Sequence, residues 1–328
     1  MDDRIVTIVN NLLPSEEDKK RLKTFENKMS NIIQNIKNWR RYRNCKLEVH
    51  LFGSSKNGLW SNQSDVDLCI FANKNGDYFD ITMRDLASLL YKKNMDNVEP
   101  IINTRIPICK FKDPETGFSC DISCNNRIPI YNSRLISCYM KFDERVRDIV
   151  MIVKKWAKDR CINNSKDRTF SSYTFVLLCI SYFQRIDPPV LPNLQDEKAF
   201  PDLNMFEIDK VKFYDKNNEV SRYFISRNQM SRSELLIGLF KFYGCDYRYE
   251  DNFCSIRTNG GFKSYLDDTE KNFIPTKLAV EDPFIHKRVV NSNSGEEEKV
   301  HIINEFYRAY NILRETHDLD RIFDNSDI

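Results

Sequence analysis

The chain has 328 residues, of which 41% are hydrophobic and 30% charged, an ordinary globular composition. Glycine is scarce and aromatic residues make up 12%, which excludes collagen-like, low-complexity and broadly disordered chains. Fifty basic against 48 acidic residues leave a net charge of +2, so any binding to a polyanion must come from local patches. At about 150 residues per domain, the length predicts two domains.

Targeting and redox features are equally restrictive. The apolar runs are far shorter than the ~20 residues that a membrane span needs, and the acidic residues after Met1 argue against a signal peptide. The ten cysteines are scattered and the histidines number four, which argues against disulfide and zinc sites. We therefore expect reduced thiols in a cytoplasmic or nuclear protein without a membrane partner.

The first half of the chain alternates between helical and strand patterns. Apolar residues recur every three or four positions over 15–39, which predicts a helix capped by Ser15. Alternation then predicts strands at 47–51 and 65–71, a helix near 80–93, and a hairpin of strands near 105–112 and 118–124. Because the first helix precedes the strands, we expect residues 1–45 to pack with a later helical domain.

The second half is mainly helical, with helices expected at 143–160, 171–186, 231–243 and 298–315. Residues 187–230 are rich in Pro, Asn and Asp and are expected to form loops with short elements. The whole pattern predicts an α+β fold, in which a small unit containing the strands is embedded in a mainly helical chain.

Three acidic residues and a Gly-Ser pair carry the chemistry. Gly53-Ser54 closes a strand and offers backbone N–H groups and a hydroxyl to a phosphate, although such turns are common. Asp65 and Asp67 share one strand face, and like charges this close stay ionised when a cation lies between them. Two aspartates in this pattern, with no other motif nearby, usually belong to a solvated strand face. Asp121 in a later strand adds a third carboxylate, and three can hold two metal ions.

Residues 52–54 and 64–69 together resemble the DNA polymerase β-like nucleotidyltransferase superfamily. Residues 120–126, 154–158, 171–173 and 280–284 narrow the resemblance to noncanonical poly(A) polymerases and terminal uridylyltransferases, closest to the minimal two-domain cytoplasmic uridylyltransferases. The resemblance implies a catalytic nucleotidyltransferase domain at 46–165, with a mixed sheet and flanking helices. It also implies a helical, base-recognising central domain at 166–328, preceded by the helical segment 1–45.

The resemblance also implies roles for individual residues. Asp65, Asp67 and Asp121 would hold two divalent ions, Mg²⁺ or Mn²⁺. The nucleotide would contact Gly53, Ser54, Asn126, Asn132, Lys154, Lys158, Ser172, Tyr173, Asp282 and His286. In this set Ser54, both lysines and Ser172 would bind the triphosphate, Tyr173 would stack on the base, Asn132 would contact the ribose 2′-hydroxyl, and Asp282 would lie beside the base edge. By spacing alone, the lysines could equally form a solvated helix face.

His286 is the residue expected to favour uracil over adenine, because a histidine follows the Glu-Asp-Pro-Phe motif in the uridylyltransferases. Here the intervening loop is shorter than theirs, so the nucleotide preference stays open between UTP and ATP. The basic residues Arg40, Arg41 and Arg43, interleaved with Trp39 and Tyr42, are candidates for binding single-stranded RNA. The alternative for this run is a solvated helix end.

The leading hypothesis is template-independent addition of UMP to RNA 3′ ends, a reaction of RNA tailing and decay. The alternatives are a poly(A)-adding or mixed-specificity enzyme, a nucleotidyltransferase that acts on a small molecule, and a catalytically inactive RNA-binding protein. The expected partners are UTP or ATP and an RNA 3′ end, and no sequence feature points to a protein partner.

Overall fold

The structure is a computed structural model, and it describes residues 1–61, 64–104, 106–195, 212–216, 220, 224–258, 260–265, 277–285 and 288–325. The chain divides into two compact units, one formed by Leu13–Ser137 and the other by Met1–Leu12 with Cys138–Ile328. Of the helices that are described, none combines the length and apolar character that crossing a membrane requires.

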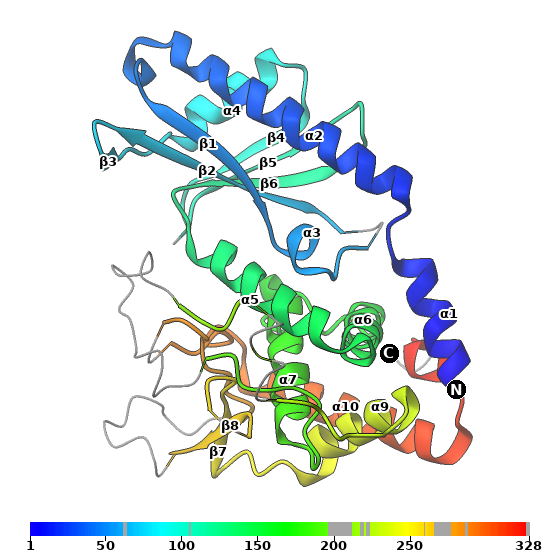
Figure 1. The fold of residues 1–328 in the computed structure, drawn as a ribbon. Coiled ribbons are helices and arrows are strands. Elements are labelled where there is room, and N and C mark those ends of the chain that lie inside the picture. Colours follow the sequence, from blue (N-terminus) through cyan, green and yellow to red (C-terminus); the bar gives the residue numbers. More distant parts are fainter. Residues whose placement is uncertain are drawn as a thin grey trace. The chain divides into compact units, whose positions relative to one another are not determined.

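The unit Leu13–Ser137 is built on a mixed sheet (Figure 1). Its strands run in the spatial order β1-β2-β6-β5-β4, and a short β3 pairs with the far end of β2. β2 lies parallel to β6, and the other pairs are antiparallel. The strands are β1 (Lys46–Phe52), β2 (Val66–Lys74), β3 (Asp77–Tyr78), β4 (Asp96–Ile101), β5 (Ile108–Lys112) and β6 (Ser119–Cys124).

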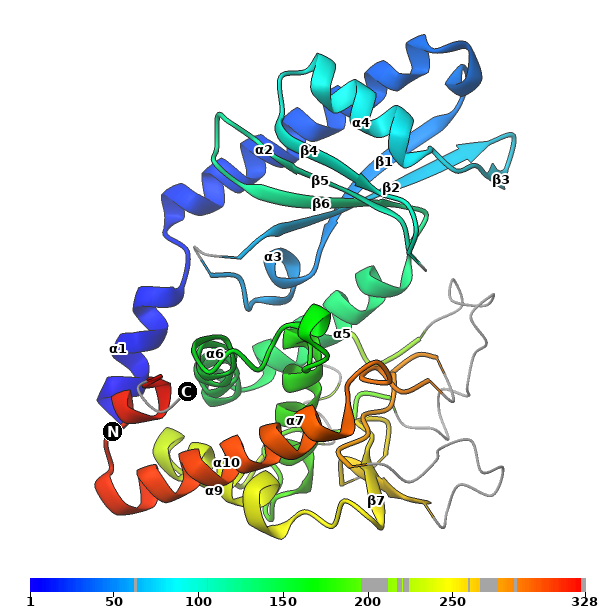
Figure 2. The same ribbon diagram turned by 180° about the vertical axis from the view of Figure 1, so that it is seen from behind.

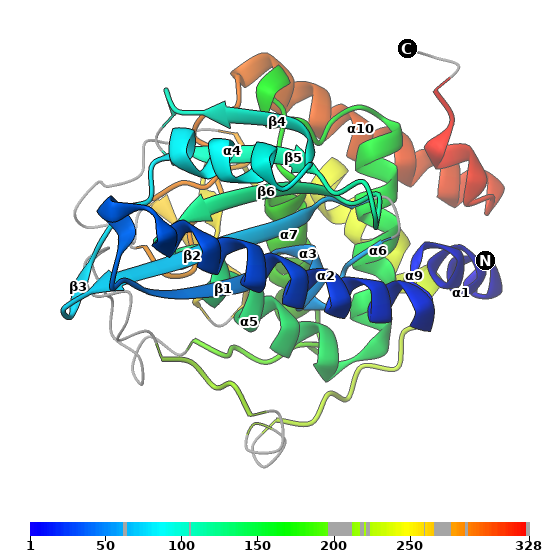
Figure 3. The same cartoon turned by 90° about the horizontal axis from the view of Figure 1, so that it is seen from above.

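One face of this sheet is covered by α2 (Glu16–Gln34) and α4 (Met83–Lys92), as Figures 1 to 3 show from three sides. A capping box formed by Ser15 and Asp18 starts α2, and its stripe of Phe25, Met29 and Ile33 is fully buried. Alternation along β2 sends Val66, Leu68, Ile70 and Ala72 into the same core. Asp67 and Phe71 therefore lie on the opposite face, where α3 (Ser54–Asn57) is found (Figure 2).

The other unit is mainly helical. Its core gathers around Trp156, whose ring centre lies 5.0 Å from that of Phe240 and 4.9 Å from that of Phe306. The helices are α1 (Asp2–Leu12), α6 (Glu144–Asp159), α7 (Ser172–Arg185), α9 (Arg232–Lys241) and α10 (Glu296–Thr316). A small hairpin of β7 (Asn252–Cys254) and β8 (Phe262–Ser264) accompanies them, and α5 (Ile128–Phe142) begins in the first unit and ends in this one.

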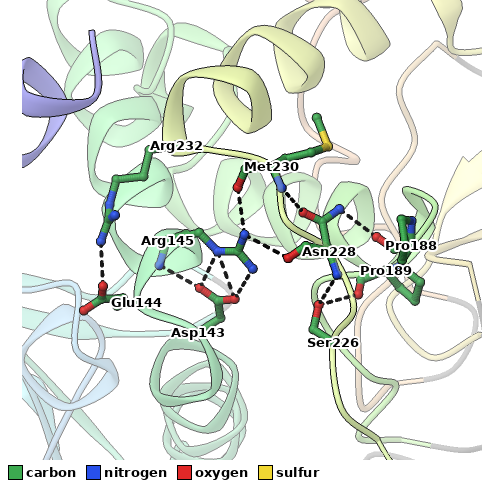
Figure 4. Close-up of polar contacts among 9 residues, drawn as sticks. All are labelled: Asp143, Glu144, Arg145, Pro188, Pro189, Ser226, Asn228, Met230 and Arg232. Atoms are coloured by element: carbon green, nitrogen blue, oxygen red, sulfur yellow. Dashed lines mark hydrogen bonds and ion pairs between the residues drawn. The ribbon is translucent and has the colours of Figure 1, made fainter.

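A polar network fastens the chain that leads into α9 to the start of α6 (Figure 4). Arg145 donates to the carbonyl oxygens of Asn228 and Met230 at 3.1 and 2.7 Å, and Asp143 accepts from the same guanidinium at 2.6 Å. Asn228 is almost completely buried, and its side chain donates to the Pro188 carbonyl. Charge-assisted hydrogen bonds of this kind are stronger than neutral ones, so they stabilise the connection between this segment and α6.

The predicted α+β class is confirmed, but several predicted elements differ from the structure. α1 and α5 were not predicted, and neither were β3 and β4. The predicted helix 15–39 ends at Gln34 and continues as two short 3₁₀ turns, Asn35–Asn38 and Arg40–Tyr42. The expected boundaries near 45 and 165 also differ from the compact units: α2 packs on the sheet because its apolar stripe shares the core of β1 and β2, and only Met1–Leu12 joins the helical unit.

Candidate active site

Two of the three expected carboxylates are neighbours in the sheet. β2 and β6 pair in a register that places Asp67 directly beside Asp121, on the face opposite the core. Both side chains are half-buried. Asp65 was predicted to lie within the strand, but β2 begins at Val66, so Asp65 stands exposed just before it. The backbone register therefore brings Asp67 and Asp121 together without help from any loop.

Gly53 is required where it stands. Its φ of +67° lies in the left-handed region, and a Cβ built there would be 2.2 Å from the Asp67 Oδ2 atom. The Gly53 N–H donates to Ser133 Oγ at 2.7 Å, and that hydroxyl donates to the Pro129 carbonyl at 2.6 Å. Ser133 thus fixes the turn that begins α3 with Ser54. Ser133 was not predicted, because a serine inside a helical segment carries no signal of such a role.

Lys110 is a second site residue that was not predicted. It lies opposite Asp121 in the β5–β6 register, and its Nζ atom donates to both carboxylate oxygens at 2.7 and 2.6 Å. The signal was present in the predicted hairpin, where Lys110 and Asp121 sit at positions that an antiparallel pairing can bring together. The exact register was needed to single out this lysine.

The carboxylates suit divalent metal ions by their chemistry and placement. Carboxylate oxygens are the hard ligands that Mg²⁺ and Mn²⁺ prefer, and Asp67 and Asp121 occupy adjacent positions. Across the described segments, no group of three or more His, Cys, Asp and Glu side chains is placed to hold a metal ion by itself. The contact between Asp121 and Lys110 shows where one carboxylate is directed instead. Asp67 and Asp121 lie side by side in the sheet, and the expectation that they hold the ions together with Asp65 stays a prediction.

Asn126 and Asn132 follow β6. The Asn126 carbonyl oxygen accepts from Cys69 Sγ at 3.3 Å, which holds this turn over β2. Asn132 lies on α5, and its Oδ1 atom is buried without a hydrogen-bond partner in the described structure. A buried amide oxygen left unpaired costs free energy, so this atom is suited to accept a hydrogen bond from a ligand hydroxyl.

In the helical unit, Lys154 and Lys158 lie one turn apart on α6, where Lys154 is half-buried and Lys158 exposed. The neighbouring Lys155 serves the structure, because it pairs with Asp159 and stacks on the ring of Phe323. Ser172 is the first residue of α7, and Asn163 lies 3.2 Å from its hydroxyl. This side chain therefore lies where the N–H groups of a helix start are exposed.

Tyr173 and Asp282 are the buried candidate residues of the helical unit. The Tyr173 hydroxyl is buried and, among the described atoms, lacks a hydrogen-bond partner. Burial, and then the nearby Asp282 carboxylate, raise the pKa of Tyr173 well above its usual range. Asp282 accepts from the N–H groups of Phe284 and Ile285, both at 2.9 Å. Burial nevertheless raises the pKa of Asp282, and the two N–H donors and Arg288 offset only part of this rise.

The predictions for His286 and for the basic run Arg40–Arg43 have different outcomes. His286 lies outside the described residues, so its role stays a prediction. The basic run Arg40–Arg43 precedes β1, and the first residue of that strand lies six positions, about 20 Å, from the one that pairs with Asp67. Arg41 lies 3.7 Å from Asp85. Tyr42, an aromatic residue within this run, is fully buried and its hydroxyl donates to Asp85, so its ring is not exposed to RNA.

The mixed sheet with its register-paired carboxylates and its Gly-Ser turn defines the polymerase β-like nucleotidyltransferase fold. Two family models match the chain: "Poly(A) RNA polymerase, mitochondrial-like, central palm domain" over residues 1–141, and "Cid1 family poly A polymerase" over residues 233–288. The chain belongs to the family of noncanonical poly(A) polymerases and terminal uridylyltransferases that includes Cid1.

Individual relatives carry both kinds of name. Poly(A) RNA polymerase cid11 of Schizosaccharomyces pombe is 30% identical over 95% of this chain and 62% of its own length. Terminal uridylyltransferase 7 of Homo sapiens is 31% identical over 77% of this chain and 17% of its own. The solved structure of the Cid1 poly(U) polymerase with Mg and 3′-dATP has a TM-score of 0.79 at 26% identity, covering 99% of this chain and 98% of that one. The chain thus spans less than two thirds of these two curated relatives.

Proposed function

We propose that this protein adds UMP from UTP to the 3′ end of RNA without a template and releases pyrophosphate. The observation that carries the proposal is the placement of Asp67 beside Asp121 on adjacent parallel strands, with the backbone of Gly53 packed against the Asp67 carboxylate. Carboxylates placed in this way suit the transfer of a nucleotidyl group, in which charge develops on the attacking and leaving oxygens.

The candidate residues would have different roles, which follow from their chemistry. Two divalent ions, Mg²⁺ or Mn²⁺, bound by Asp65, Asp67 and Asp121 would activate the 3′-hydroxyl and stabilise the leaving pyrophosphate. Asp67 and Asp121 would orient the attacking oxygen toward the α-phosphorus, while Ser54 holds the phosphates. In the helical unit, Lys154, Lys158 and Ser172 would bind the triphosphate as cations and as a hydroxyl donor.

The base and ribose contacts follow from the unpaired polar groups. Asn132 Oδ1 would accept from the ribose 2′-hydroxyl, with Asn126 nearby. The Tyr173 ring would stack on the base, and Asp282 would face the edge of the base, where uracil presents its N3–H donor. Ionised Asp282 would accept a hydrogen bond from this N–H but would repel an acceptor atom of the base. Its protonation state therefore bears directly on which base is bound.

A second candidate is the same reaction with ATP, which the name of the cid11 relative favours. His286 would decide between them, because a donor near uracil O4 attracts uracil and crowds the larger adenine. Each such contact is worth about 1–3 kcal/mol, or roughly 10- to 200-fold. Cytoplasmic action in RNA tailing and decay belongs to this proposal as well.

The test incubates the protein with a labelled oligo(A) primer, Mg²⁺ or Mn²⁺, and each NTP in turn. We expect primer extension, with UTP preferred in kcat/KM and the preference reduced in His286→Asn. Equal use of UTP and ATP by the wild type, unchanged in His286→Asn, would leave the ATP alternative standing. A wild-type protein that binds the primer but extends it with none of the four NTPs is an inactive RNA-binding protein, and the proposal fails.

A further inference from the structure

Lys110 is placed by the sheet to compete for a catalytic carboxylate. Cys109 and Phe111 point into the core, so Lys110 between them lies on the same face as Asp67 and Asp121. Its Nζ atom bonds both oxygens of Asp121, at 2.7 and 2.6 Å. Neither side chain is fully buried, with 31% and 26% of the two surfaces exposed, so both can move.

The charges on this face explain why an ammonium group is useful there. Asp67 and Asp121 stand side by side, and two carboxylates at this separation repel one another unless a cation compensates them. Lys110 supplies one positive charge when no metal ion is bound. The same contact uses both Asp121 oxygens, whereas a divalent ion needs at least one of them as a ligand.

We propose that Lys110 is a resident counter-ion for Asp121 that is displaced when a divalent ion binds. It stabilises the metal-free protein and, for the same reason, weakens metal binding, because the ion must first break the bond between lysine and carboxylate. Lys110 is thus a positioning residue that sets the metal concentration at which the site fills. This inference rests on the metal site of the proposed function, and it adds a residue to that site.

The experiment measures Mn²⁺ binding by the loss of the free-ion electron paramagnetic resonance signal, and thermal unfolding with and without Mn²⁺. Neither RNA nor nucleotide is present. In Lys110→Met, we expect the metal-free unfolding temperature to fall and Mn²⁺ affinity to rise by about fivefold, the scale of a partly exposed ion pair. The stabilisation by Mn²⁺ should then be larger than in the wild type.

Two matched variants separate the contact from the overall charge. Lys112 is exposed on the same face of β5, two residues further along and opposite Ser119. Lys112→Met removes the same charge without touching Asp121, and we expect almost unchanged Mn²⁺ affinity. Lys110→Arg keeps the cation and should bind Mn²⁺ no more tightly than the wild type.

A double-mutant cycle with Asp121→Asn completes the test. Once the Asp121 charge is gone, Lys110→Met should no longer tighten Mn²⁺ binding, because the two residues act through one contact. Unchanged or weaker Mn²⁺ binding by Lys110→Met overturns the role, and so does equal tightening in Lys112→Met. A protein that shows the Lys110 effect but extends no RNA contradicts the proposed function and leaves this inference standing.

Discussion

The candidate residues of the sheet unit and those of the helical unit have opposite surroundings. In the sheet unit, Asp67 and Asp121 are half-buried, adjacent through backbone register, and close to a cation, Lys110. In the helical unit, Asp282 is almost completely buried, and the Tyr173 hydroxyl near it is buried without a partner among the described residues. One part gathers charge at an accessible surface, and the other removes polar groups from water.

The contrast indicates which kind of energy each part contributes. A charged, accessible cluster attracts ions of opposite charge but discriminates poorly among them, because Coulomb attraction is insensitive to shape. Buried groups with unmet hydrogen bonds discriminate well, since a wrong partner leaves them unpaired. We therefore expect substitutions of the charged carboxylates to abolish chemistry, and substitutions of buried groups, Asn132 of the sheet unit included, to change selectivity or pH dependence.

The largest effect should come from the carboxylates. Asp67→Asn or Asp121→Asn should lower the single-turnover rate of primer extension by about a thousandfold, equivalent to about 4 kcal/mol, because the metal ligands are lost. Asp77→Asn, an exposed aspartate on β3, serves as the control and should extend normally. Near-normal extension by either site variant would contradict the metal assignment.

Asn132→Ala should reduce the preference for UTP over dUTP by roughly 10- to 100-fold, because the ribose hydroxyl loses its acceptor. The kcat/KM for dUTP should hardly change, which provides an internal control. The measurement is the ratio of kcat/KM for the two nucleotides in wild type and variant. An unchanged ratio would assign the buried Oδ1 atom to another role.

The exposed pair Arg40 and Arg43 should have a smaller effect. Replacing both by glutamine should raise the KM of a long primer about threefold and flatten its salt dependence, while the KM of UTP stays constant. The run precedes β1, and β1 begins about 20 Å along the sheet from the residue that pairs with Asp67, so a short primer should be unaffected. Lys19 and Lys20 changed to glutamine are the charge-matched control. An unchanged KM for the long primer would indicate that the basic run is a solvated helix end.

The smallest effect concerns stability and pH. Since the folded-state pKa of Asp282 is raised, its contribution to stability is present below the ordinary Asp range and is lost as pH rises through the folded pKa. Asp282→Asn removes this loss. As pH rises from about 4 to 7, the free energy of unfolding of the variant should therefore increase relative to that of the wild type. The slopes of unfolding free energy against pH should differ by less than the value for one proton, which is about 1.4 kcal/mol per pH unit. Urea unfolding at several pH values measures this, and parallel profiles would contradict the raised pKa.

Local patterns predicted a good part of this molecule. The alternation of β2 and β6 indicated the faces of Asp67 and Asp121, and the spacing of apolar residues located α2, α6, α7 and α10 within a few residues. These features depend on neighbours in the chain, so that they can be recognised in one dimension. α5 escaped prediction, although the Pro at its second position lies in the first turn, where a helix tolerates it.

The sequence by itself determined the residue types of the candidate site and the strands that carry its carboxylates. The tertiary structure alone decided that α2 covers the sheet, that Lys110 meets Asp121, that Ser133 holds Gly53, and that Tyr42 turns inward. Each of these pairings joins residues distant in the chain, and they depend on strand register and on which surfaces can be buried together. Sequence spacing does not encode either property, because both arise when the whole chain packs.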